Sequence, residues 1–207
     1  MPNVRLQKIA VDFWGESELV LSRFRHIFAK GHETCSASHG WTQEMSVVRL
    51  QDSWSRFCRE LVIISASERP VTAAGTLVPL APGISRRSDA LNALHVVYTR
   101  PPYEPKWFDA QACLRAASIL RLNNYASVSG GIGVTPSPLD DLRALRNFLA
   151  HRSQMTATGV RDTAIRNSLP PKSGVIAILQ SDSTNPGMTI LQLWVKQLQT
   201  MALIAVR

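Results

Sequence analysis

One segment late in the chain, residues 145–152, combines side chains that together can act on phosphate esters. It contains Arg146, Asn147 and His151 in the spacing Arg-Asn-x3-His. A guanidinium orients and neutralises a phosphodiester through paired hydrogen bonds. An imidazole exchanges a proton near neutral pH, because its ordinary pKa is about 6.5. The segment therefore predicts phosphate chemistry.

Positive charge is concentrated around this segment. The chain of 207 residues has a net charge of +8 and a pI near 10.0. Residues 143–172 contain one acid, Asp162, and a set of cations: Arg143, Arg146, Arg152, Arg161, Arg166 and Lys172. Such an excess of cations favours an anionic partner, and nucleic acids are the partners most often met by small basic domains.

The segment belongs to a helix that the sequence predicts from about residue 138 to 152. Ser137 is suited to cap it, Pro138 to open it, and Asp140 and Asp141 to interact with its dipole. On an ideal helix the leucines 142, 145 and 149 form the apolar face, so we expect His151 to point away from the core. Arg146 lies roughly 140° around the helix from His151.

This separation is too wide for the two side chains to form a good pair within one helix. A second copy of the helix would supply the missing partner. Ala144 and Ala150 are small enough for another helix to approach the same surface closely.

The rest of the chain is mostly predicted to be helical, which gives an all-α fold. The clearest stripe of apolar residues at helical spacing runs from about residue 43 to 67. Further helices are expected over residues 16–30, 89–98 (capped by Ser88), 107–123 and 189–206. Residues 71–84 and 127–138 are predicted to be connections, and residues 175–179 fit either a short strand or an apolar plug.

Composition indicates one domain over residues 1–207, because a chain that is 45% hydrophobic can build one sizeable core. The N-terminus lacks the pattern of a secretory signal, and polar residues interrupt the apolar run at residues 189–206. We therefore expect a cytoplasmic protein without a membrane span. Gly130-Gly131-Ile132-Gly133 lacks the Lys and Ser or Thr of a phosphate-binding loop, so it predicts an inter-helix connection.

Neither cysteines nor histidines suggest a metal or a cofactor. Cys35, Cys58 and Cys113 are odd in number and widely spaced, and Cys58 falls on the buried stripe of its helix. His32 and His39 lie near Glu33 and Cys35 without a recognised ligand spacing. His95 is expected to pack in its helix, and the tryptophans 14, 41 and 107 are expected in the core or an interface.

Two segments resemble the HEPN superfamily, all-helical proteins that include many prokaryotic ribonucleases, and within it the RiboL-PSP-type branch. One is Leu145-Arg146-Asn147-Phe148-Leu149-Ala150-His151-Arg152, which carries Arg-x4-His. The other is Trp54-x-Arg56-Phe57-x-Arg59-Glu60-Leu61-Val62. The resemblance covers roughly residues 43–67 and 138–152.

The resemblance implies a HEPN-like helical bundle with long connecting loops, working as a homodimer. It implies a metal-independent, cofactor-free endoribonuclease in which the RNA 2′-hydroxyl attacks the adjacent phosphate. His151 would be the general base or acid, Arg146 would orient the phosphate, and Asn147 would hold one of the reacting groups. Arg143 and Arg152 would bind the RNA backbone. A toxin-like or phage-defence role with an antitoxin or operon-encoded partner would follow.

Two other functions are compatible with the same residues. The first is a catalytically silent HEPN-like module that binds a protein or a nucleotide through the polar face of the helix. The second is a helical protein that binds DNA or RNA through the basic segment without cleaving it.

Overall fold

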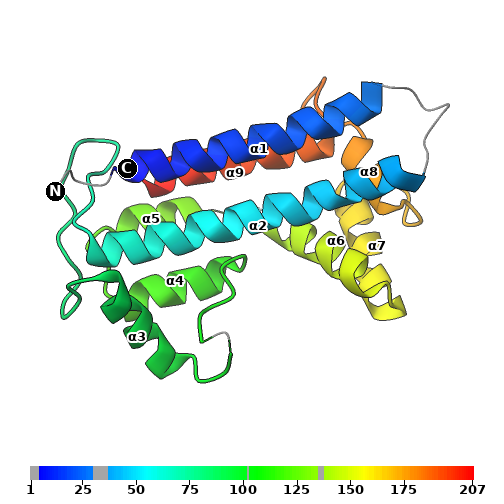
Figure 1. Ribbon diagram of the computed structural model, residues 1–207. Helices are drawn as coiled ribbons and strands as arrows, with labels where there is room; N and C mark the ends of the chain where they lie inside the picture. The colour runs from blue at the N-terminus through cyan, green and yellow to red at the C-terminus, as the bar shows by residue number, and fades with distance from the viewer. Residues whose placement is uncertain (1–4, 30–36, 102, 135–137) are drawn as a thin grey trace. The chain divides into compact units, whose positions relative to one another are not determined.

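The computed structural model describes residues 5–29, 37–101, 103–134 and 138–207, and for residues 27–29 and 37–42 it describes the backbone only. This part of the chain forms α-helices and contains no strand (Figure 1), so the prediction of an all-α fold is confirmed. The helices are α1 (Leu6–Ala29), α2 (Ala37–Ser67), α3 (Arg87–Val97), α4 (Ala110–Ile119), α5 (Tyr125–Ile132), α6 (Leu139–His151), α7 (Gln154–Arg166), α8 (Val175–Gln180) and α9 (Ile190–Ala205).

The chain divides into two compact units. The first unit comprises residues 1–14, 53–136 and 199–207, and the second comprises residues 15–52 and 137–198. The helices α1, α2 and α9 each contribute residues to both units. A single domain over residues 1–207 stays a prediction.

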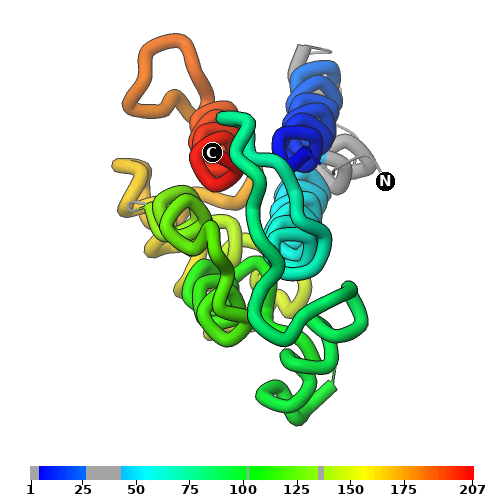
Figure 2. The backbone as a smooth tube through the Cα atoms, turned by 90° about the vertical axis from the view of Figure 1, so that its left-hand side faces the viewer, coloured from blue at the N-terminus to red at the C-terminus, as the bar shows by residue number. Residues whose placement is uncertain are grey.

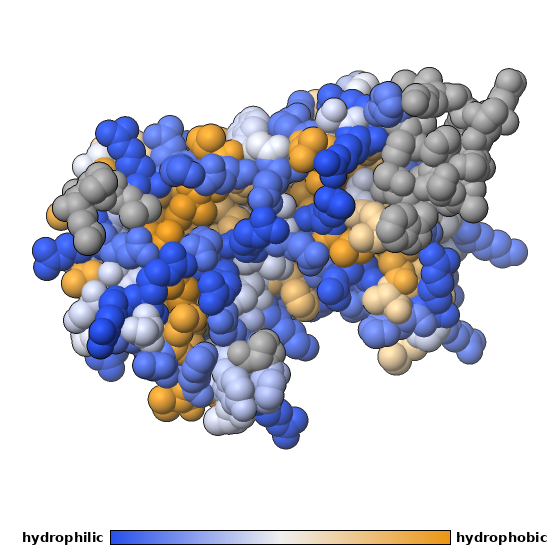
Figure 3. All heavy atoms as spheres, viewed as in Figure 1, coloured by the Kyte–Doolittle hydropathy of each residue, from blue (hydrophilic) through white to orange (hydrophobic). Residues whose placement is uncertain are grey.

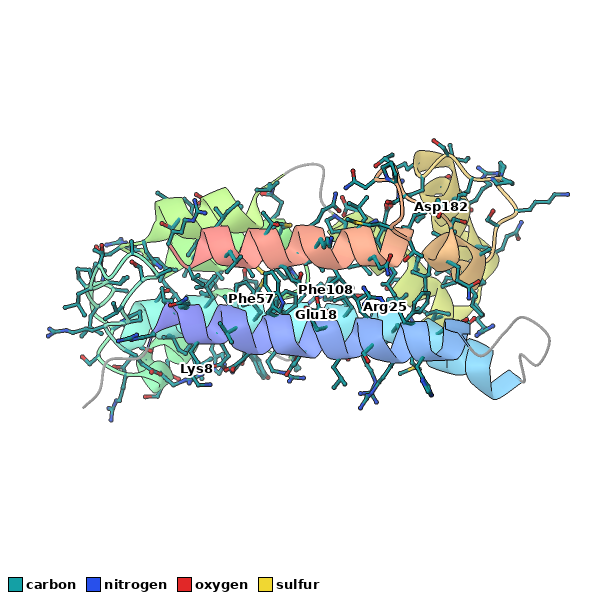
Figure 4. All side chains as sticks on the ribbon, turned by 90° about the horizontal axis from the view of Figure 1, so that it is seen from above. Lys8, Glu18, Arg25, Phe57, Phe108 and Asp182 are labelled. Carbon is teal, nitrogen blue, oxygen red and sulfur yellow. The ribbon has the colours of Figure 1, made fainter. Side chains whose placement is uncertain are left out.

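The core of the first unit is built on the apolar stripe of α2. Trp54 is fully buried and lies 5.5 Å from Phe13 of α1 and 5.2 Å from Phe57, measured between ring centroids. Figure 4 shows Phe57 among the interior side chains and Lys8 on the outer side of α1. Cys58 and Cys113 are both buried free thiols, and burial raises the pKa of Cys58. Cys58 is therefore an unreactive core residue, as its position on the stripe predicted.

The helix α5 occupies part of the segment that the sequence predicts to be a connection. Its Gly131 faces α9 so closely that a Cβ atom there would lie 2.5 Å from the backbone nitrogen of Ala205. Only glycine fits at this contact, so Gly131 serves helix packing. The prediction of a connection over residues 127–138 is therefore wrong for residues 127–132.

The connection between α2 and α3 is confirmed as non-helical, and Figure 2 shows its extended course. It is fixed by backbone hydrogen bonds from Leu6 N to Val71 O (2.9 Å) and from Ala73 N to Val206 O (2.8 Å). The following helix, α3, is capped by Asp89, whose carboxylate accepts from the backbone N–H groups of Ser85 and Arg86. These bonds lower the pKa of Asp89. Ser88 is not the cap, contrary to prediction.

In the second unit, α6 and α7 form an antiparallel helical hairpin (Figure 1) joined by Arg152 and Ser153. Arg152 ends α6 in the left-handed conformation (φ 41°), and the hydroxyl of Ser153 caps α7 by accepting from Thr156 N. At the far end, the carboxylate of Asp141 accepts from Arg166 Nε (2.9 Å) and Asn167 Nδ2 (3.3 Å). These contacts fix the position of the site helix.

Several boundaries differ from the sequence-based expectation. The helix α1 begins at Leu6, ten residues before the predicted start, because Leu6, Ala10 and Phe13 are buried at helical spacing. The predicted helix 107–123 is shorter, since Asp109 caps α4 and Arg121 adopts a positive φ of 53° after it. Residues 175–180 form the helix α8. Ser137, the predicted cap of α6, lies outside the described residues.

The C-terminal helix agrees with the prediction. The residues of its predicted stripe are all buried in α9: Leu191, Trp194, Leu198, Met201 and Ala205. None of the helices in the described ranges combines the length and the apolar character that crossing a bilayer requires.

Candidate functional site

His151 is the last residue of α6, and its side chain is exposed. The helix ends there because Arg152 turns into the left-handed region while its N–H donates to Phe148 O (2.7 Å). An imidazole at this position is open to a substrate, and its removal leaves no cavity. The expectation that His151 points away from the core is confirmed.

Arg146 is half-buried and lines a hollow of about 210 Å³ between α2 and α6 in the second unit. We call it the α2–α6 hollow. Its other lining residues are Glu44, Met45, Val48, Leu149, Ala150 and Arg152. Apolar side chains reach the surface beside these two helices (Figure 3).

Asn147 lines a different hollow, of about 480 Å³, in the groove between α6 and α7. Arg143 lines the same groove, together with Thr156 of α7. Ala144 lies on its floor, and a Cβ on Gly159 would lie 3.2 Å from the Ala144 Cβ. The helix that approaches Ala144 in this structure is α7 of the same chain, and the approach of a second copy to this surface stays a prediction.

The three predicted catalytic residues thus do not converge within one chain. Arg146 and Asn147 line separate hollows, and His151 lines neither of them. This arrangement follows from their positions around one helix, as the separation of roughly 140° between Arg146 and His151 predicted.

Most cations of the basic segment are neutralised by acids. Arg152 donates to Glu44 at 2.7 Å, and Arg143 lies 3.0 Å from Asp140. Arg166 pairs with Asp141, and the Arg161–Asp162 distance is 3.9 Å. Within the ranges that the structure covers, no acid pairs with Arg146 or with Lys172. The excess of positive charge in the sequence is therefore reduced at this surface to a few unpaired cations.

Glu44 is a residue of the site that sequence reasoning missed. It reaches the end of α6 from α2, is 19% exposed, and lines the α2–α6 hollow beside Arg146. Because it binds Arg152, it fixes the residue that follows His151. The two partners are 108 positions apart in the chain, and no local pattern marks such a pair.

A second cluster of charged side chains lies in the first unit and has a structural role. Arg59 donates to both carboxylate oxygens of Glu104, at 2.7 and 2.8 Å, and Trp107 donates to the same group at 2.8 Å. The hydrogen bonds from Arg59, and then the one from Trp107, hold the pKa of Glu104 below its usual value against the opposing effect of burial. The cluster fixes the segment before α4 to α2.

The metal hypothesis has no geometric support among the described residues, where no three side chains of His, Cys, Asp or Glu gather closely enough to hold an ion. His32 and Cys35, and the side chain of His39, lie outside the description. His95 is exposed, with its ring 5.7 Å from that of Tyr103. Of the tryptophans, Trp107 is buried and Trp14 is 40% exposed, whereas the Trp41 side chain lies outside the description.

Comparisons of the chain with protein-family models, with curated proteins and with solved structures find no match. The likeness to HEPN proteins therefore depends on the two quoted segments alone, and the function has to be argued from the site.

Proposed function

We propose that the protein is a metal-independent endoribonuclease that uses Arg146, Asn147 and His151. The observation that carries the proposal is that these side chains lack partners among the described residues while their neighbours are paired. Within the described part of the chain, none of the three has a hydrogen-bond or ion-pair partner, whereas the neighbouring arginines are paired. Polar groups of one helix that are left without partners are available to a ligand.

The reaction requires one base and one acid. The 2′-oxygen of a ribose forms a bond to the adjacent phosphorus as a base takes its proton, and the bond from phosphorus to the 5′-oxygen breaks as an acid protonates the leaving oxygen. His151 fills one of these roles. Arg146 orients the phosphate and stabilises its developing charge. Asn147 positions the attacking hydroxyl or one of the other two groups.

A second copy of the chain completes the site in this proposal. The helix α6 has a single histidine, His151, on a different side of the helix from Arg146, so a two-fold dimer at the end of α6 would supply both a base and an acid. Arg143 and Arg152 are 43% and 60% exposed, and they contribute secondary phosphate contacts when they exchange their acid partners for RNA.

His151→Ala tests the proposal. We expect cleavage of single-stranded RNA to fall by a factor of about 10² to 10⁴, with unchanged thermal unfolding because the side chain is exposed. His26→Ala, which removes another exposed histidine near the end of a helix, is the matched control. Wild-type cleavage by His151→Ala would exclude the proposed site.

The products test the chemistry. Cleavage should persist in a chelator, leave a 2′,3′-cyclic phosphate or its hydrolysis product and a 5′-hydroxyl, and spare a substrate without 2′-hydroxyls. A requirement for magnesium would exclude attack by the 2′-hydroxyl alone. Growth arrest on expression, relieved by His151→Ala, would support the toxin or defence role and justify a search for an antitoxin.

The alternative is a catalytically silent module that binds a protein or a nucleotide. The apolar walls of the α2–α6 hollow favour it, because they offer binding surface without chemistry. Binding of RNA without cleavage by the wild type would favour this alternative. Binding by the basic segment alone has less support, since most of its arginines are paired with acids.

A further inference from the structure

The α2–α6 hollow combines apolar walls with a cation, Arg146, that has no acid partner in the described ranges. Met45 and Val48 of α2 face Leu149 and Ala150 of α6 around it. These side chains are half-buried, apart from the exposed Ala150. An apolar surface that remains partly open to water gains free energy when a flat apolar group covers it.

The charges of the hollow reduce to one cation. Glu44 and Arg152 neutralise each other at 2.7 Å, and Arg146 has no acid partner in the described residues. The occupant that complements this arrangement is a flat apolar group joined to an anion. A guanidinium also stacks on the face of a ring, which a lysine does not do as well.

The volume limits the size of the occupant. The hollow holds about 210 Å³, less than the roughly 300–1,000 Å³ typical of sites for drug-sized ligands. It has room for one ring system, and it is too small for a helix or a strand. A nucleotide of single-stranded RNA has the required form, because its base can leave the stack while its phosphate stays on the strand.

We propose that the α2–α6 hollow seats one unstacked base of the RNA substrate. The base lies between the α2 and α6 walls, and the phosphate joined to it binds Arg146 at the edge. This inference rests on the proposed ribonuclease function. It adds α2 to the site, and it makes Met45, Val48 and Leu149 the residues that select which base is accepted beside the cleaved bond.

Methyl NMR on the intact protein tests the base seat without any cleavage. The probes are adenosine 5′-monophosphate and uridine 5′-monophosphate, with ribose 5-phosphate as the probe that lacks a base. We expect both nucleotides to shift the methyl signals of Met45, Val48 and Leu149 through ring currents, in a saturable manner. Ribose 5-phosphate should leave the same signals nearly unchanged.

A large side chain that fills the α2–α6 hollow provides a second test of base binding. Val48→Trp should weaken nucleotide binding by about fivefold or more, the lower end of what one stacked base contributes. Val11→Trp makes the same change at an exposed position of α1 and should leave binding unchanged. Ala150→Trp, at an exposed residue of the hollow, serves if Val48→Trp does not fold.

The outcomes separate the base seat from the ribonuclease proposal. If the nucleotides shift these methyl signals but the protein does not cleave RNA, the base-binding proposal is supported and the ribonuclease proposal is excluded. If the protein cleaves RNA but the nucleotides do not shift these methyl signals, the base-binding proposal is excluded and the ribonuclease proposal is supported. Shifts caused by N-acetyltryptophan but by neither nucleotide would assign the hollow to a protein side chain and would also overturn the inference.

Discussion

At the scale of single residues, pairing with acids separates the arginines of the site. Arg146 has no acid partner among the residues that the structure describes, whereas Arg143 and Arg152 would have to give up Asp140 and Glu44 before binding a phosphate. We expect Arg146→Met to reduce the slope of log affinity against log salt by about 0.7, the value for one phosphate contact on a single strand.

Arg143→Met and Arg152→Met should each reduce the salt-dependence slope of RNA affinity less than Arg146→Met does. All three would be measured with single-stranded RNA on a His151→Ala background, so that the RNA stays intact. If the slope of log affinity against log salt falls equally in the three variants, the acid partners of Arg143 and Arg152 do not weaken their binding to phosphate. Such a result would support the prediction that Arg143 and Arg152 bind the RNA backbone.

A second residue-scale prediction concerns acid stability in the first unit. The folded-state pKa of Glu104 is lowered by Arg59 and Trp107, so its stabilisation is complete above about pH 4.3, the ordinary value for glutamate. It is lost as the pH falls through the lower, folded-state value. The difference in unfolding free energy between the wild type and Glu104→Gln should therefore shrink in acid.

Chemical denaturation across a pH series measures this difference. Trp107→Phe removes one of the donors to Glu104 and retains an aromatic ring, so it should produce a smaller change of the same sign. A difference between the wild type and Glu104→Gln that stays constant from neutral to acid pH would mean that the ion pair does not shift the titration of Glu104.

The sequence predicts local residues of the site well and distant ones poorly. Arg146, Asn147 and His151 share a helix, so their relative directions follow from the helical repeat alone. Glu44 escapes prediction because its role arises from packing of α2 against α6. The acids Asp140 and Asp141 lie just before the basic segment in the sequence, and folding pairs them with Arg143 and Arg166.

At the scale of elements, the same distinction explains which helices were foreseen. Strong apolar stripes predict α2 and α9, and turn signals place the start of α6. The helix α7 is not predicted from the sequence, because its buried face is short and only weakly apolar and consists of Val160, Thr163 and Ala164. The helix α5 contradicts its local signal, since paired glycines normally favour a connection, and contact with α9 explains only Gly131.

Neighbouring glycines of α5 provide a matched test of this explanation. Gly131→Ala places a Cβ atom 2.5 Å from backbone atoms of α9, so it should destabilise the fold by about 1–3 kcal/mol or more. At Gly130 the nearest atom would be Ile204 Cγ2, at 3.9 Å. Gly130→Ala should therefore stabilise by about 0.5–1 kcal/mol, as expected for a helix interior.

Denaturant unfolding of both variants measures the two changes. Equal effects of Gly130→Ala and Gly131→Ala would show that the glycines matter only for backbone entropy. Opposite signs would establish that packing against the C-terminal helix requires glycine at position 131 and not at position 130.

At the scale of the whole molecule, the proposed dimer is limited by what each chain already covers. Ala144 packs against Gly159 of its own α7, so a bulky residue there would disturb the hairpin and would not report on association. Ala150 is exposed near the end of α6 and lines the α2–α6 hollow, so a second copy that approached it would lie beside the proposed binding position of the base.

Mixing the wild type with His151→Ala tests whether the catalytic site is shared between chains. If the two histidines of a two-fold dimer act as base and acid, a mixed dimer lacks one of them and is inactive. Random exchange of subunits at equal amounts makes about half of the dimers mixed and leaves about a quarter of them wild type. The activity of the wild-type chains should therefore fall to about half of its value without the variant, and a larger excess of His151→Ala should lower it further. If each chain used its own arginine and histidine, the added variant would leave the activity of the wild-type chains unchanged.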